Sequence, residues 1–111
     1  MTEADAAALL AALSHETRLK IFRILIRAGH DGVAAGQLAQ ALGVSPSNLT
    51  AHLNVLSQAG LVGARRDGRN RFYQVDIPAV AGLVDYLVSD CCEGQKEVCG
   101  PVLARAGGAC D

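Results

Sequence analysis

The sequence predicts a mainly α-helical domain that carries one small β-hairpin, an α+β fold. Three observations predict it. Half of the 111 residues are apolar but only 4% are aromatic, so the core is built from Leu, Ile, Val and Ala, a composition that favours helices. Apolar residues recur with helical spacing over most of the first 60 residues. The pattern then changes to two short strand-like segments around Asp67-Gly68, a pair typical of a tight hairpin turn.

The first two predicted helices supply a large part of the core. Residues 3–13 are Ala-rich and helical, and Ser14 is predicted to cap the helix that follows and ends at Gly29. The segment 30–34 is expected to be a loop. The predicted inward faces are Leu9, Leu10 and Leu13 in the first helix and Leu19, Phe22, Leu25 and Ile26 in the second.

Two further helices follow with a very short connection. Residues 36–43 form a short helix that ends at Gly43, and only Val44 and Ser45 separate it from a helix that starts at Pro46. Ser is a favoured N-cap residue and Pro is tolerated at the first helical position. Helices joined by so tight a turn are typical of a helix-turn-helix, in which the second helix enters the major groove of DNA.

The helix that starts at Pro46 has two different faces. One face is apolar, since Leu49, Leu53 and Leu56 recur at the spacing of a buried stripe. The other is polar, and no acidic residue occurs between Ser45 and Val62, so this surface can lie against a polyanion. His52 is expected to position the helix or to donate to a phosphate. The predicted DNA contacts are Ser45, Ser47, Asn48, Thr50, His52 and Asn54.

The hairpin predicted over residues 61–76 is a basic wing. The net charge of −1 argues by itself against a nucleic-acid-binding protein, but the charges are unevenly distributed, with acids near both ends of the chain. Basic side chains on a hairpin can contact phosphates or the minor groove, so we predict a winged helix-turn-helix. The apolar anchors are Leu61, Val62, Phe72, Tyr73 and Val75, and the DNA-contacting side chains are Arg65, Arg66, Arg69 and Arg71.

The last predicted helix, residues 78–92, lies outside this winged core. Its apolar stripe therefore needs a partner, and the simplest partner is the same helix of a second copy, together with the N-terminal helix, in a two-fold homodimer. We expect one domain over 1–92 and a flexible, cysteine-containing tail over 93–111. The stripe consists of Val80, Leu83, Val84, Leu87 and Val88.

Other features narrow the class of protein. The chain has neither a leader-like start nor an apolar run of ~18 residues, which predicts a cytoplasmic protein without membrane contact. Four cysteines then indicate thiols for metal or redox chemistry rather than disulfides. An enzyme is not expected, because the sequence has no C-x-x-C motif, no phosphate-binding Gly loop and no acid–base group near the thiols.

Three stretches, L-S-H-E-T-R-L-K-I-F-R-I-L, S-P-S-N-L-T-A-H-L-N-V-L-S-Q-A-G-L-V and R-R-D-G-R-N-R-F-Y, resemble the arsenical-resistance repressor (ArsR) family of metal-sensing winged helix-turn-helix regulators. The resemblance covers roughly residues 7–90. It implies a homodimer that represses an arsenic-resistance operon by binding double-stranded operator DNA with dyad symmetry. It also implies that an inducer releases the DNA.

The resemblance also suggests where the inducer binds. Founding members have thiols on the helix before the recognition helix, and zinc-sensing relatives use Asp and His on the last helix. Here residues 36–45 have no Cys, and the last helix has Asp85 but no His. The chain is similar instead to an arsenite-responsive subgroup with a cysteine pair at the end of the last helix and a third just downstream. This similarity implies Cys91, Cys92 and Cys99 as ligands, with Cys110 as the alternative third ligand.

The chemistry of the inducer fits thiol ligands. As(III) and Sb(III) are soft centres with a lone pair and prefer a pyramid of three thiolates, whereas zinc takes four ligands. Three alternatives stay open within the same family. They are a methylated trivalent arsenical held by two thiols, a zinc or cadmium site that uses all four thiolates, and a thiol-redox or persulfide switch.

Overall fold

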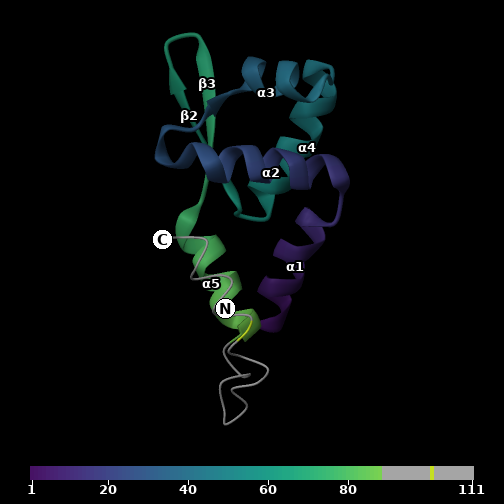
Figure 1. Ribbon diagram of the computed structural model, residues 1–111, viewed down its shortest axis with the longest axis vertical. Helices are drawn as coiled ribbons and strands as arrows, with labels where there is room; N and C mark the ends of the chain where they lie inside the picture. Colours follow the sequence, from purple (N-terminus) through teal and green to yellow (C-terminus); the bar gives the residue numbers. More distant parts are fainter. Residues whose placement is uncertain (89–100, 102–111) are drawn as a thin grey trace.

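The computed structural model describes residues 1–88 and 101, and within them helices surround a small antiparallel sheet (Figure 1). The sheet has the strand order β1-β3-β2. This arrangement confirms the predicted mainly α-helical, winged helix-turn-helix fold. The elements are α1 (Glu3–Leu13), α2 (Glu16–Ala28), the 3-10 turn η1 (Gly29–Asp31), β1 (Val33–Ala34), α3 (Ala35–Leu42), α4 (Pro46–Gln58), β2 (Val62–Asp67), β3 (Asn70–Val75) and α5 (Ile77–Val88).

The core lies where α2, α3 and α4 meet one face of the sheet. The predicted stripe Leu49, Leu53 and Leu56 is buried at no more than 1% exposure, so the inner face of α4 is confirmed. Burying a Leu side chain contributes about 1.5–3 kcal/mol, which makes this stripe the main attachment of α4. The other fully buried side chains are Ile21, Leu25, Leu38 and Leu61.

The inward faces predicted for α1 and α2 need correction. In α1 the buried residues are Ala6, Leu9 and Ala12, whereas Leu10 is 43% exposed. Small residues on this face let α1 approach α2 and α4 closely. In α2 the residues Leu19 and Ile26, predicted to face the core, are exposed, Phe22 is half-buried, and the buried residues are Ile21 and Leu25. The helix has two neighbouring apolar stripes, and its contacts with other elements determine which one is buried.

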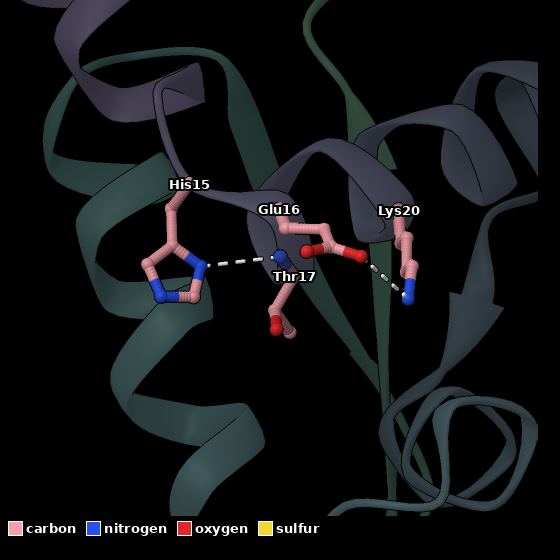
Figure 2. Close-up of polar contacts among 4 residues, drawn as sticks. All are labelled: His15, Glu16, Thr17 and Lys20. Carbon is pink, nitrogen blue, oxygen red and sulfur yellow. Dashed lines mark hydrogen bonds and ion pairs between the residues drawn. The ribbon is translucent and has the colours of Figure 1, made fainter.

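The predicted cap of α2 is also one residue off. The cap is His15, whose ring Nδ1 accepts a hydrogen bond from the backbone N–H of Thr17 at 3.1 Å (Figure 2). Ser14 instead closes α1, because its hydroxyl donates to the carbonyl of Ala11 at 2.8 Å. Figure 2 also shows the ion pair between Glu16 and Lys20, 3.4 Å apart, both of which are highly exposed.

The segment expected to be a loop contains η1 and a third strand. The two residues of β1 pair antiparallel with β3, Val33 opposite Tyr73 and Ala34 opposite Phe72. The chain enters this strand through Gly32 at φ +74°, where a Cβ would lie 2.6 Å from the carbonyl oxygen of Tyr73. Only glycine fits such a close approach to a neighbouring strand. A strand of two residues has no detectable period, which is why the sequence pattern missed it.

The molecule has two distinct ends. Figure 1 shows α3, the start of α4 and the tip of the β2–β3 hairpin together at one end, with α1 and α5 at the other. Contacts between α1 and α5 agree with this placement. The predicted domain boundary at residues 92–93 and the predicted tail lie outside the described residues.

Candidate nucleic-acid interface

The turn between α3 and α4 fixes the direction in which α4 leaves the body. Gly43 ends α3 in the left-handed conformation, at φ 66° and ψ 34°, and the N–H of Val44 donates to the carbonyl of Ala39 at 3.1 Å. Ser45 then caps α4, since its hydroxyl accepts from the N–H of Asn48 at 3.2 Å. A left-handed glycine and an N-cap with a single residue between them leave no room for a flexible loop. The first turn of α4 is therefore held against α3.

The polar side chains of α4 are not equivalent. Ser45 acts as the cap and lies 3.3 Å from the hydroxyl of Ser47, and the hydroxyl of Thr50 donates to the carbonyl of Pro46 at 2.9 Å. The hydroxyls of Ser45 and Thr50 are therefore already hydrogen-bonded to the backbone of α4. Each oxygen still has a lone pair that can accept another hydrogen bond. Ser47, Asn48 and Asn54 are exposed, and their side chains extend from the surface of α4.

The exposed face of α4 includes residues that the polar pattern did not single out. Ala51, Val55 and Gln58 are exposed and share a face with Ser47 and Asn54, at the spacing i, i+4, i+7, i+8 and i+11 from Ser47. An aliphatic side chain on a recognition helix can contact the methyl group of thymine. The helical spacing alone would have identified these three positions.

His52 lies at the border of that face and is half-buried. Its Nδ1 is 3.5 Å from Nη1 of Arg18, and its ring centroid is 4.5 Å from that of His15. Burial lowers the pKa of His52, and the neighbouring His15 and Arg18 lower it further. Through these contacts His52 joins α4 to the start of α2, so it can set the position of α4.

The four arginines of the wing, which is the β2–β3 hairpin, differ in their contacts. Nη2 of Arg65 donates to the carbonyl of Asp31 at 2.7 Å, and its guanidinium lies 5.0 Å from the centroid of the Phe72 ring. Arg65 thus ties the wing to η1. Within the described residues, neither Arg66, Arg69 nor Arg71 has a hydrogen bond or an ion pair.

Arg66 and Arg71 are directly opposite each other on β2 and β3, so their side chains point to the same face of the wing. It is the face that carries buried Val62, Tyr73 and Val75 closer to the body. Like charges directly opposite each other destabilise a strand pair. A phosphate between them would remove the repulsion, so the pair is suited to bind an anion.

The cationic residues of the described chain are concentrated in two places. Before residue 89 every Lys and Arg lies either in residues 18–27 on α2 or in residues 65–71 on the wing, and α4 has neither. The recognition helix can therefore offer only hydrogen bonds, apolar contacts and its N-terminal dipole. Phosphate affinity at this end of the molecule has to come mainly from the wing.

Replacing Arg66 or Arg71 with Ala is expected to weaken binding to any DNA sequence. Each lost phosphate contact should flatten the plot of log affinity against log salt by about 0.9. Asn54→Ala is the matched control, because it should change base preference and leave the slope unchanged. Fluorescence anisotropy measures the salt slope and the base preference. It is recorded across a salt series, on a duplex from upstream of this protein's gene and on a random duplex. A slope unchanged in Arg66→Ala and Arg71→Ala would remove these residues from the interface.

The predicted metalloid ligands Cys91, Cys92 and Cys99, and the alternative Cys110, lie outside the described residues. In the part of the chain that the structure describes, no group of three or more His, Cys, Asp or Glu side chains could hold a metal ion. A search of the same residues found no helix with the length and apolar character needed to span a bilayer.

Comparison with known proteins adds the family. Residues 13–62 match a protein-family model described as a helix-turn-helix domain. The structure of an ArsR-like transcriptional regulator from Rhodococcus sp. RHA1 is 30% identical, with 93% of each chain covered and a TM-score of 0.71. The chain belongs to the ArsR family. Its relatives in this family are DNA-binding transcriptional regulators.

Two other similar proteins are informative. The putative arsenical resistance operon repressor of Halobacterium salinarum is 43% identical over 82 residues, which cover 74% of this chain and 62% of that one. The homodimeric winged helix-turn-helix domain Mb0332 of Mycobacterium bovis is 28% identical, with 79% of this chain and 81% of that chain covered and a TM-score of 0.63. A similar but uncharacterized regulator from Mycobacterium tuberculosis is 36% identical over 72 residues, which are 65% of this chain. The chain spans only 61% of the length of that relative.

Proposed function

We propose that this ArsR-family chain is a homodimeric transcriptional repressor that binds double-stranded operator DNA with dyad symmetry. The observation that supports this most directly is the position of the start of α4 at the same end of the molecule as the tip of the wing. α4 offers uncharged hydrogen-bonding groups suited to base edges, and Arg66 and Arg71 form an anion-binding pair suited to the backbone. Neither surface alone would favour DNA as strongly as the two together.

The proposed dimer uses α1 and α5. These helices contact each other and expose large apolar side chains far from the wing. Val84 is 45% exposed and Leu87 is 54% exposed, although both belong to the predicted stripe of α5. The other exposed large apolar residues of α5, α1 and the segment before α1 are Ile77, Leu10 and Met1. A second copy would cover them, and dyad symmetry of the operator would follow. The similar mycobacterial domain is itself a homodimer.

The proposed inducer is trivalent arsenic or antimony, bound by Cys91, Cys92 and a third thiol from Cys99 or Cys110. Two observations support it. Residues 1–88 contain no cysteine and no cluster of metal-binding side chains, so a soft ligand has to use the four thiols that follow. The similar Halobacterium protein is a putative repressor of an arsenical resistance operon. A methylated arsenical, zinc or cadmium, or thiol oxidation are the alternative inducers.

Release of DNA tests this proposal. The full-length reduced protein is bound to a fluorescent duplex from upstream of its own gene and titrated with arsenite, methylarsenite, zinc or cadmium. A phosphine reductant is used, because a dithiol would compete for arsenite. We expect arsenite to release the wild type and Cys110→Ser, while Cys91→Ser and Cys99→Ser stay bound.

If arsenite instead released Cys99→Ser while Cys110→Ser stayed bound, Cys110 would be the third ligand. Release by methylarsenite or an oxidant alone would overturn the inducer and leave the repressor intact. A protein that binds the duplex from its own gene no better than a random duplex would overturn the proposed sequence-specific repressor itself.

A further inference from the structure

Three side chains join the end of α1, the start of α2 and the middle of α4. Nε of Arg18 donates to the carbonyl of Ala12 at 2.6 Å, and Nη1 of the same guanidinium lies 3.5 Å from Nδ1 of His52. The ring of His52 packs against that of His15, with centroids 4.5 Å apart and an angle of 42° between the planes. His15 and His52 are 37 positions apart in the sequence and meet only in the folded chain. We call His15, Arg18 and His52 the junction.

These contacts require both imidazoles to be uncharged. The backbone N–H of Thr17 can only donate, so the Nδ1 of His15 that it contacts at 3.1 Å must be an acceptor. A guanidinium can also only donate, so Nδ1 of His52 must be an acceptor as well. An imidazolium has donors at both nitrogens and can form neither contact.

We propose that the junction is a proton-sensitive device that positions α4 relative to α1, and that mild acid disrupts it and weakens DNA binding. The proposal rests on the DNA-binding function proposed above. Protonation of His52 would place a cation beside the Arg18 guanidinium, 3.5 Å away in a part-buried contact, and beside the ring of His15. The junction would then repel α4 instead of holding it.

Within the described residues, no carboxylate forms a hydrogen bond or an ion pair with His15 or His52. α2 brings His15 and Arg18 to His52, while the nearest carboxylate of that helix end, Glu16, is paired with Lys20 and highly exposed. From α1, α3 and β2, the other elements packed against α4, no ionisable side chain within the described residues bonds to either imidazole. Burial lowers the pKa of His52, and the two neighbours lower it further, so the ring is neutral near pH 7.5 and the junction is intact there.

Disruption of the junction would affect operator binding because the junction joins α1 to α4. α1 is part of the proposed dimer surface, and α4 is the proposed recognition helix. The distance between the two recognition helices of a dimer must match about one turn of DNA, ~34 Å. A loosened junction would let that distance vary and would lower the affinity of the dimer for its dyad.

Operator affinity measured at several pH values tests the proposal. Anisotropy of a fluorescent duplex from upstream of its own gene is recorded at about pH 7.5, 6.5 and 5.5 at constant ionic strength, bracketing the ordinary pKa of His. The wild type is expected to lose at least about fivefold in affinity across this range, the lower end of typical coupling between sites. His52→Asn, which keeps a polar group but cannot titrate, should lose much less.

His30→Asn is the matched control, since His30 is an exposed histidine in η1 away from the junction, and it should follow the wild type. Affinity that stays constant or rises in acid would overturn the proposal, because added positive charge alone favours DNA. An equal acid loss in His52→Asn and the wild type would also overturn it.

Titration of the imidazole resonances by NMR without DNA separates this proposal from the proposed function. His52 is expected to take up its proton at a higher pH in Arg18→Gln than in the wild type, because the neighbouring cation is gone. If the chain bound no DNA at any pH, the proposed repressor function would be refuted. The NMR comparison of Arg18→Gln with the wild type would still test the proposed junction. Identical titration of His52 in the two proteins would refute the junction whatever the DNA result.

Discussion

Replacing Leu87 with Asp is expected to turn the proposed dimer into a monomer and to weaken operator binding by about 10²–10⁴-fold. Leu87 is the most exposed large apolar side chain of the described chain, at 54%, and lies on α5 beside exposed Val84. A carboxylate there would be buried without a partner in a dimer formed by α1 and α5. The two wings and recognition helices would then bind their half-sites independently, and the gain from joining them would be lost.

Sedimentation equilibrium and anisotropy on the same samples measure the two parts of this prediction. Leu19→Asp is the matched control, because Leu19 is 45% exposed on α2, away from the proposed dimer surface, and should leave both mass and affinity unchanged. A Leu87→Asp protein that stays dimeric would show that the dimer uses another surface. If Leu19→Asp gave the monomer instead, the exposed apolar edge of α2 would be that surface.

Replacing Leu53 with Ala is expected to lower the free energy of unfolding by about 2–5 kcal/mol. Leu53 is 1% exposed and lies in the middle of the stripe that attaches α4 to the core, between Leu49 and Leu56. Removing its side chain leaves a cavity behind the recognition helix. Since a domain of this size has only about 5–15 kcal/mol of stability, such a loss would also reduce the fraction of folded repressor.

Urea denaturation followed by circular dichroism gives this free energy directly. Leu19→Ala makes the same chemical change on an exposed side chain and is expected to cost no more than about 0.5 kcal/mol. Equal losses in the two variants would mean that α4 is not held mainly by its buried stripe. Protein concentration must be kept constant between samples, because dimerisation adds to apparent stability.

Local signals in the sequence were sufficient for most of the DNA-binding end. The glycine at Gly43, the Ser45-Pro46 start and the leucine stripe of α4 depend only on backbone preferences within one turn and on helical period. The hairpin turn at Asp67-Gly68 is equally local, and Gly68 has the positive φ that it requires, 64°. These predictions succeeded because the residues that decide them are neighbours in the chain.

Other features depend on contacts between distant residues. Arg65 and Arg66 are adjacent and chemically identical, yet Arg65 is used to hold η1 while Arg66 faces Arg71. Adjacent strand residues face opposite sides of the wing, and the partner that each side meets, η1 in the case of Arg65, is distant in the sequence. The strand β1 exists for the same reason, since it is defined only by its pairing with β3.

The sequence by itself determined the order of the elements, the capped recognition helix, the basic wing and the thiols available to a soft ligand. Only the tertiary structure decided which stripe of α2 is buried, which arginine of the wing contacts η1, and that His52 meets Arg18 and His15. The physical reason is that periodicity and capping act within a few residues, whereas burial, register and the protonation state of an imidazole depend on what the fold packs against it.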